Sequence, residues 1–160
     1  MLEYLREHCV SFMLPPIREA YSSHHPDSTG IGPEAFAYVS DDGGYTGGGG
    51  LSSRQRDFYN QHGFYITDSK YILRPEVLES NFYAWRATGD TKYLDNAASA
   101  VKSFEEYLQA TVAYSGVTNV DNVRSLKDNK MESFWFAEVL KYLYAIFLFL
   151  GRSQPNPPPF

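Results

Sequence analysis

The stretch RPEVLESNFYAWRATGDTKYLDNAASAVKSFEEYL, residues 74–108, contains two helical patterns in immediate succession and is therefore the most informative about the fold. In the first pattern apolar side chains recur at a spacing of about 3.6 residues, at Val77, Leu78, Phe82 and Trp85. Gly89 is placed to end that helix. Asp90 or Thr91 can then cap the next one. Because the connection is very short, the sequence predicts an antiparallel helix pair.

The second helix of this pair presents one apolar stripe, made of Leu94, Ala97, Ala98, Val101, Phe104, Tyr107 and Leu108. After a polar loop over residues 115–129, the stretch MESFWFAEVLKYLYAIFLFL, residues 131–150, predicts a strongly apolar third helix. Its most hydrophobic part, residues 139–151, is about half the roughly 20 residues that a membrane span needs, and it contains Lys141. We therefore expect a buried helix and no transmembrane segment in this chain.

The rest of the chain is richer in turn-forming residues. Residues 2–21 have a helical pattern that breaks at Pro15–Pro16, and residues 22–63 are dominated by turn formers. The glycine run at 47–50 indicates a flexible loop or a close approach of backbone. The stretch FYITDSKYIL, residues 64–73, has strand-like content around a polar Asp-Ser centre, which predicts a small β-hairpin. The fold class is therefore all-α with a small hairpin in the loops, followed by a proline-rich tail at 151–160 that cannot continue a helix.

Composition narrows the possible functions. The chain has 160 residues, the length of one domain, and a formal net charge of −5. It has no cluster of lysine or arginine, so the sequence predicts neither a nucleic-acid partner nor an anionic membrane surface. Aromatic residues make up 16% of the chain, which suits either a helical core or a groove that stacks sugars. Cys9 is the only cysteine, so no internal disulfide is possible, and the N-terminal stretch MLEYLREHCV does not have the pattern of a secretory signal.

The start of the first helix, RPEVLES, carries a pair of carboxylates. Pro75 suits the first helical position, where its missing N–H costs nothing. Glu76 and Glu79 then lie one above the other in the first turn, where the helix dipole favours their ionised forms. They could decorate a solvated helix start. If the face is buried, they would repel each other unless Arg74, a metal ion or water compensates.

Two further glutamates are candidates for the same site. Glu138 lies within the apolar run FWFAEVL, where a glutamate is rarely buried without a partner. Glu34 follows the turn-forming residues of TGIGPE. Carboxylate oxygens from several segments suit calcium better than zinc, and the four histidines lack metal-ligand spacing. The sequence contains no GxGxxG, P-loop or GxSxG motif.

Three carboxylate-bearing segments, in this order, resemble glycoside hydrolase family 47, the class I α-1,2-mannosidases, and are most similar to its fungal members. They are TGIGPEAF, YILRPEVLESNFYAWRATGDTKYLD and DNKMESFWFAEVLKYLYAIF. The resemblance covers about residues 20–147. It implies an (α/α)7 barrel much longer than this chain, of which residues 1–160 would form an incomplete catalytic domain containing only the last helix pairs. It also implies residence in the secretory pathway, although no targeting segment is present.

The resemblance implies a function and a set of site residues. The expected activity is calcium-dependent, inverting hydrolysis of α-1,2-linked mannose from high-mannose N-glycans. By this resemblance Glu76 would be the general base, and Arg74 would orient the catalytic carboxylates and the substrate. Four other residues would contact the terminal mannose, namely Glu34, Glu79, Phe134 and Glu138. Of these, Phe134 would lie beneath the sugar ring, while Glu79 and Glu138 would hold the calcium ion through its water shell.

The chain also departs from the family pattern. The family's general acid and a further catalytic aspartate lie upstream of the segments matched here. The threonine that ligates calcium directly belongs to a terminal motif beyond the resemblance, which ends at about Phe147. The expectation is therefore a C-terminal fragment that is inactive alone and prone to aggregate. Two alternatives stay open: a non-catalytic glycan-binding or quality-control module, and a helical fragment without function.

Overall fold

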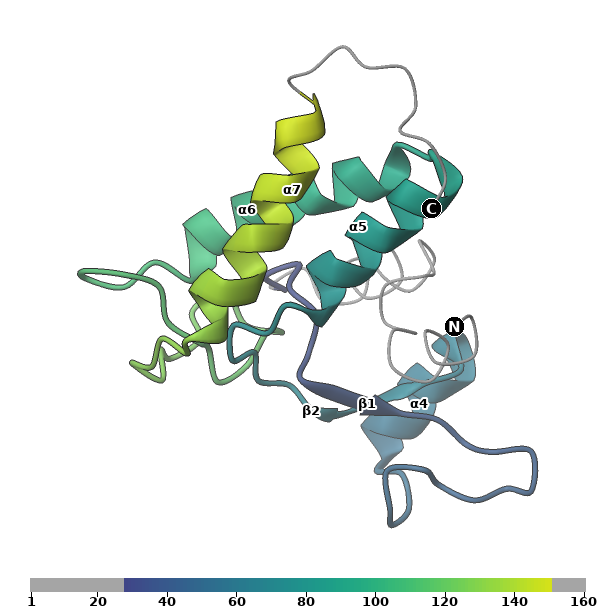
Figure 1. Ribbon diagram of the computed structural model, residues 1–160. Coiled ribbons are helices and arrows are strands. Elements are labelled where there is room, and N and C mark those ends of the chain that lie inside the picture. The colour runs from purple at the N-terminus through teal and green to yellow at the C-terminus, as the bar shows by residue number, and fades with distance from the viewer. Residues whose placement is uncertain (1–27, 151–160) are drawn as a thin grey trace.

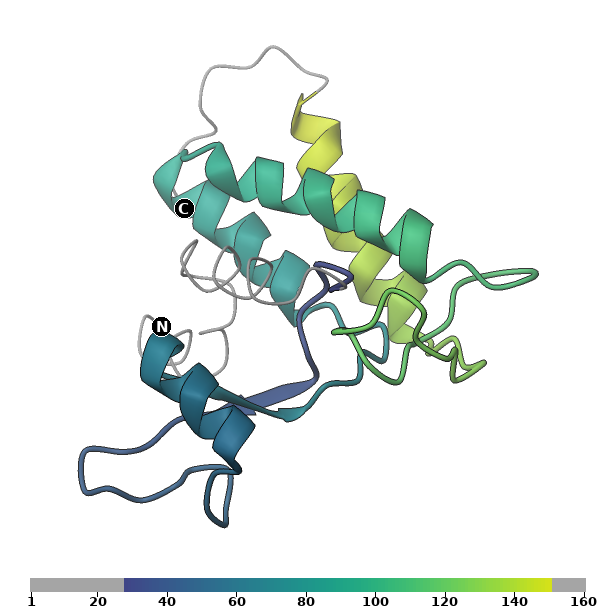
Figure 2. The ribbon, with the colours of Figure 1, turned by 180° about the vertical axis from the view of Figure 1, so that it is seen from behind.

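The computed structural model describes residues 28–150 (Figures 1 and 2). The helix predicted over residues 2–21 and the proline-rich tail at 151–160 lie outside the described residues. In chain order the elements are β1 (Ala35–Ala37), α4 (Ser53–His62), β2 (Tyr65–Asp68), α5 (Glu76–Thr88), α6 (Lys92–Tyr107), the π-helical segment η1 (Trp135–Leu140) and α7 (Lys141–Leu150). The described residues are thus mostly helical, with one small two-stranded sheet.

The predicted helix pair is confirmed as α5 and α6. Gly89 adopts a left-handed conformation with φ of 72°, and its N–H donates to the carbonyl of Trp85 at 2.7 Å, which ends α5. Thr91 is at the capping position of α6 but makes no side-chain capping bond. The Asp90 carboxylate instead accepts from the N–H of Lys92 at 3.0 Å. The capping role therefore falls to the first of the two predicted residues.

Helix α7 packs against both α5 and α6, and the main hydrophobic core lies among these three helices and η1 (Figures 1 and 2). Aromatic rings connect the elements. Tyr71 stacks on Phe104 with centroids 5.9 Å apart, and Phe104 meets Trp135 edge-on at 5.5 Å. The fully or almost fully buried aliphatic side chains of this core are Leu73, Leu78, Leu108, Val117, Val120, Val139 and Ile146. Part of the aromatic content thus serves the helical core.

The loop over residues 115–129 is more buried than its polar composition predicts. Tyr71 and Val117 exchange two backbone hydrogen bonds, of 3.0 and 2.9 Å, so the loop pairs with the segment that leads into α5. The buried Ser115 hydroxyl donates to the Asp128 carboxylate at 2.9 Å and accepts from the N–H of Asn129 at 2.9 Å. Several polar residues of the loop therefore satisfy one another, while Val117 and Val120 enter the core and Val123 stays exposed.

The third helix differs from its prediction in two ways. Its helical conformation begins at Trp135, as the π-helical segment η1, and not at Met131. It is also not buried all round, because only one side faces the core. Val139 and Ile146 are fully buried, whereas Phe136 is 59% exposed and Tyr144 is 68% exposed. Within residues 28–150 no helix has both the length and the apolar character needed to cross a membrane.

The prediction of a hairpin within residues 64–73 is wrong, because the strand formed there pairs with a different segment. The strand β2 does form within FYITDSKYIL, but it pairs antiparallel with β1, as in the register Ala37 to Tyr65 and Phe36 to Ile66. The Asp-Ser centre does not reverse the chain. Tyr71, just beyond it, pairs instead with Val117. The backbone bonds of this stretch are therefore satisfied by two distant segments, which a local hairpin pattern cannot indicate.

Helix α4 lies within residues 22–63, the region predicted to be dominated by turn-forming residues. Ser52 and Gln55 form a reciprocal capping box, and Gly63 ends the helix in a left-handed conformation. None of the residues of α4 is buried, so the helix has no strong apolar periodicity. Of the two alternatives for the glycine run, a close approach holds at Gly47. A Cβ there would lie 2.7 Å from Thr67 Cγ2 and 2.8 Å from Ala37 Cβ.

Candidate active site

The candidate site begins with a turn that separates a buried side chain from an exposed one. Leu73 is fully buried and adopts a left-handed backbone conformation with φ of 67°, which is unfavourable for a residue with a side chain. Arg74 follows it and is exposed. Pro75 is buried, has helical dihedral angles, and accepts at its carbonyl from the N–H of Glu79 at 2.9 Å. The turn therefore anchors the start of α5 while directing Arg74 outward.

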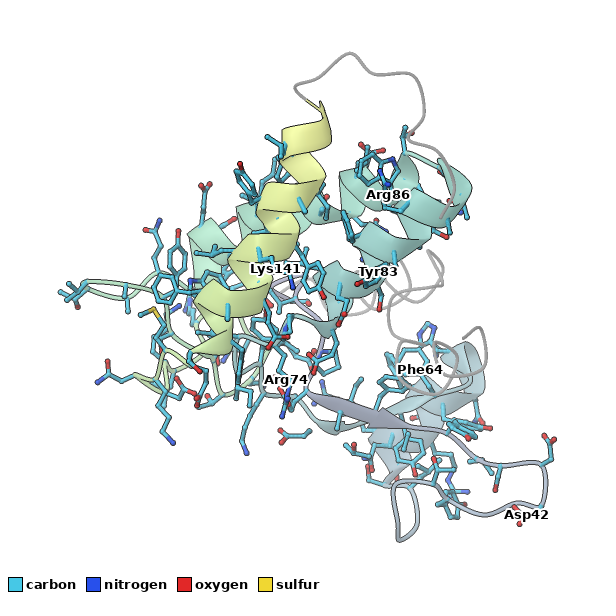
Figure 3. All side chains as sticks on the ribbon, viewed as in Figure 1. Asp42, Phe64, Arg74, Tyr83, Arg86 and Lys141 are labelled. Atoms are coloured by element: carbon cyan, nitrogen blue, oxygen red, sulfur yellow. The ribbon has the colours of Figure 1, made fainter. Side chains whose placement is uncertain are left out.

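Arg74 brings two of the predicted carboxylates together at the junction of the helices and the sheet (Figure 3). Its Nε donates to Glu34 Oε1, and its Nη1 lies 3.5 Å from Glu76 Oε1. Glu34 is also fixed by its backbone, since its N–H donates to the carbonyl of Lys70 at 2.7 Å. The hydrogen bond to Glu34 raises the pKa of Arg74 above its ordinary value, and the charge of Glu76 adds to this. Two carboxylates thus share one cation.

Aromatic rings flank this cluster. The guanidinium carbon of Arg74 lies 6.0 Å from the centroid of the Phe134 ring, at the limit of a cation–π contact. The Tyr71 hydroxyl donates to the carbonyl of Arg74 at 3.0 Å. Burial raises the pKa of Tyr71, and the charges of Glu76 and Glu34 raise it further. The buried Tyr71 hydroxyl is therefore hydrogen-bonded to the backbone of the cluster formed by Glu34, Arg74, Glu76 and Phe134.

Glu79 is directed to a different partner. Its Oε1 accepts from the Tyr142 hydroxyl on α7 at 2.6 Å. Tyr142 is 6% exposed, and burial together with this hydrogen bond raises its pKa well above the usual range. Glu76 and Glu79 thus occupy the same first turn of α5, but Glu76 lies beside Arg74 whereas Glu79 is bound to α7.

Glu138 lies on η1, is half-buried, and belongs to a segment that packs against α5. Among residues 28–150, no group of three or more His, Cys, Asp or Glu side chains is arranged to hold a metal ion directly. Glu34 Oε2 is buried and has no hydrogen-bond partner within that range. The donors present are hard oxygens, which fit calcium in type. Because fewer than three of these side chains meet at one point within residues 28–150, they fit only a calcium ion that is held through water.

Residues 17–149 match the family described as Glycosyl hydrolase family 47. The chain belongs to glycosyl hydrolase family 47. It is 40% identical over 150 residues to mannosyl-oligosaccharide alpha-1,2-mannosidase 1B of Aspergillus phoenicis, a match covering 92% of this chain and 28% of that protein. The enzyme of the same name from Aspergillus oryzae is 38% identical over 144 residues, covering 89% and 26%. The resemblance predicted from the three carboxylate segments is confirmed.

A solved structure supports the same assignment. The alpha-1,2-mannosidase from Trichoderma reesei matches this family 47 chain with a TM-score of 0.67 and 44% sequence identity. The match covers 82% of this chain and 27% of that one. The family 47 chain described here therefore spans 26–28% of the length of these relatives.

Sequence reasoning missed two residues that contact the predicted site residues, Tyr71 and Tyr142. Each lies near a predicted site residue in the sequence. Tyr71 is three positions before Arg74, and Tyr142 is four positions after Glu138 on the same helical run. With 13 tyrosines in the chain, tyrosine by itself is no pointer. Only the fold shows which two hydroxyls reach the candidate residues.

Proposed function

We propose that this chain forms the part of an α-1,2-mannosidase that contains the general base and part of the sugar-binding surface, acting on high-mannose N-glycans with inversion. The observation that carries the proposal is the convergence of Glu34, Arg74, Glu76 and Phe134, which come from three separate segments. The names of the relatives support it, since they are mannosyl-oligosaccharide alpha-1,2-mannosidases. The proposal includes the finer fold assignment, in which these helices are part of an (α/α)7 barrel.

The proposal assigns the general base to Glu76. An inverting glycosidase places its base about 6.5–9.5 Å from its acid, so that a water molecule fits between the base and the sugar. The Glu76 side chain is 49% exposed, so water can reach it. The positive end of the α5 dipole and the guanidinium of Arg74, whose Nη1 lies 3.5 Å from Glu76 Oε1, place positive charge beside this carboxylate. The general acid is assigned to a part of the family 47 domain that these 160 residues do not include.

The neighbouring residues then have separate tasks. Arg74 would hold Glu76 and Glu34 in fixed orientations, because it contacts both carboxylates. Phe134 would offer an apolar surface to the face of a sugar ring. Glu34 Oε2, buried and without a partner within residues 28–150, would accept from a sugar hydroxyl. Each of these roles rests on an observed contact, or on an oxygen without a hydrogen-bond partner, among residues 28–150.

Calcium belongs to the proposal as the ion that Glu79 and Glu138 would hold through water. When bound, it would order sugar hydroxyls and the attacking water. Residence in the secretory pathway follows from the proposed N-glycan substrate and is part of the same proposal.

The proposal is tested in a chimera. Residues 28–150 would replace the matching part of the Trichoderma reesei enzyme, and release of mannose from a high-mannose N-glycan would be measured with calcium and with a chelator. We expect calcium-dependent release by the chimera and none by the 160-residue chain alone. A folded chimera that releases no mannose, yet binds the glycan, would instead support a binding module.

The base assignment has its own test. Glu76→Gln in the chimera should lower the rate of hydrolysis by about 10²–10⁴-fold, the usual contribution of a general base. Glu105→Gln, an exposed position on α6, is the matched control and should leave the rate unchanged. A Glu76→Gln chimera as active as its parent would remove Glu76 from the mechanism.

A further inference from the structure

The Tyr142 hydroxyl donates to Glu79, one of the predicted site carboxylates. Its Oη lies 2.6 Å from Glu79 Oε1. Tyr142 is 6% exposed, so water competes little for this bond. A short O–H···O bond to a carboxylate is among the stronger hydrogen bonds of proteins. The contact thus joins the first turn of α5 to α7.

The Tyr142 ring is held in place by its neighbours. Its centroid lies 5.9 Å from that of Phe82 and 6.2 Å from that of Tyr83, both on α5. The ammonium of Lys141, the preceding residue on α7, lies 4.9 Å from the Tyr142 ring centroid. Lys141 and Tyr83, labelled in Figure 3, mark the two helices that meet here. A ring packed in this way cannot swing away from Glu79 without disturbing both helices.

A fixed hydroxyl matters because a free glutamate has many conformations. Ordering its side chain costs conformational free energy, which a binding site must otherwise supply when the ligand arrives. The bond at Oε1 holds that oxygen beside Tyr142 and so restricts the directions in which Oε2 can point. A structure without this bond would have to order Glu79 during binding.

We propose that Tyr142 is a positioning residue for the sugar-facing carboxylate of Glu79, holding it in the orientation that binds a mannoside. The inference rests on the proposed function, because that function is what gives Glu79 a ligand. It adds a residue that no sequence motif indicated, and it gives α7 a task beyond packing. Tyr142 acts through Glu79 and does not itself contact the sugar.

The test is a double-mutant cycle read by binding of α-1,2-mannobiose to the full chain in excess calcium, measured by titration calorimetry. Tyr142→Phe keeps the ring and removes only the hydroxyl. It should weaken binding about tenfold, the equivalent of one hydrogen bond to a charged group. In a Glu79→Gln background the same change should alter the Kd less than twofold. Tyr144→Phe, an exposed position on the same helix, is the matched control and should bind like the unchanged chain.

The outcomes separate the inference from the function. If the unchanged chain binds and Tyr142→Phe binds equally well, the positioning role is wrong and the proposed function stands. An equal loss in both Glu79 backgrounds would show that the hydroxyl only stabilises the fold, which also overturns the inference. If the unchanged chain binds no mannobiose with or without calcium, the positioning role fails, whereas the proposed function is decided separately by the activity of the chimera.

A second variant covers the case in which Tyr142→Phe does not fold, as judged by circular dichroism. Glu79→Asp keeps the carboxylate charge and the Tyr142 ring, but its shorter side chain draws the carboxylate away from the hydroxyl. It should weaken mannobiose binding by about the same tenfold factor. Unchanged binding by Glu79→Asp would contradict a positioning role for Tyr142.

Discussion

Two parts of the molecule use their side chains in opposite ways. The helical part, residues 71–150, contains all but one of the buried members of the main core, from Tyr71 to Ile146. The sheet part, residues 34–68, buries only Ala37, Phe64 and Tyr65 and contains a helix without a buried residue. The helical part is held by packing. The sheet part depends on local hydrogen bonds and glycine conformations.

The candidate site lies where these two parts meet. Glu34 comes from the sheet part, whereas Arg74 and Glu76 begin the helical part. The well-packed helical part thus positions Arg74, and the less packed sheet part supplies Glu34, one of the two carboxylates that Arg74 contacts. A site at such a junction depends on both parts being correctly placed, and substitutions in each part should reveal how unequal their contributions are.

The largest contrast should come from truncating a leucine in each part. Leu78 on α5 is 1% exposed, so Leu78→Ala should lower the free energy of unfolding by about 2–5 kcal/mol. Leu51 is half-buried, so Leu51→Ala should lower the free energy of unfolding by less than about 1 kcal/mol, because the leucine side chain buries little apolar area. Urea denaturation measures both. Equal losses would mean that the sheet part is packed as firmly as the helices.

A smaller contrast concerns two glycines. A Cβ on Gly116 would lie 2.7 Å from the Tyr71 carbonyl oxygen, so Gly116→Ala should cost about 1–3 kcal/mol through crowding of the backbone. Gly50 has no neighbour within 4 Å of such a Cβ and should tolerate alanine within about 0.5 kcal/mol. Thermal melts of the two variants give the comparison. A neutral Gly116→Ala would show that the loop can move away from Tyr71.

Helix caps should give an effect of about 1 kcal/mol, this time larger in the sheet part. Ser52 Oγ accepts from the Gln55 N–H at 3.3 Å, so Ser52→Ala should destabilise α4 by about 1 kcal/mol. Thr91 makes no capping bond, so Thr91→Ala should leave α6 unchanged. Amide hydrogen exchange, read helix by helix, locates the loss. Faster exchange in α6 after Thr91→Ala would contradict the assignment of its cap to Asp90.

The smallest effects should come from two aspartates with opposite pKa shifts. Burial raises the pKa of Asp121, so its ionisation opposes folding, and Asp121→Asn should stabilise the chain at neutral pH. The gain should vanish as the pH falls below the ordinary aspartate pKa, where the folded and unfolded states are both protonated. Hydrogen bonds from Ser40 and Gly44 lower the pKa of Asp42. Its contribution should be present at neutral pH and lost as the pH falls through that lowered pKa.

The two aspartates are compared by melting temperature at neutral and at acidic pH. We expect Asp121→Asn to melt above the unchanged chain at neutral pH and Asp42→Asn slightly below it. Both differences should shrink on acidification. A rise in the stabilisation by Asp121→Asn at low pH would mean that burial is not the cause of its pKa shift.

The sequence alone determined the helix pair, the stop at Gly89, the apolar third helix and the glutamates at the start of α5. These features depend on contacts within a few residues, namely helical periodicity, a left-handed glycine and a carboxylate near a helix N-terminus. The family could be recognised because its three segments keep their local patterns.

Which groups meet in space depends on the tertiary fold. Three contacts join residues that are distant in the chain. They are the pairing of β2 with β1, the hydrogen bond from Tyr142 to Glu79, and the ion pair of Arg74 with Glu34, which Arg74 forms beside Glu76. Such contacts follow from how buried surfaces fit together, and no local pattern records which of many tyrosines or strands will be the partner. Helix α4 was missed for a related reason, since a helix that buries nothing leaves no apolar period to detect.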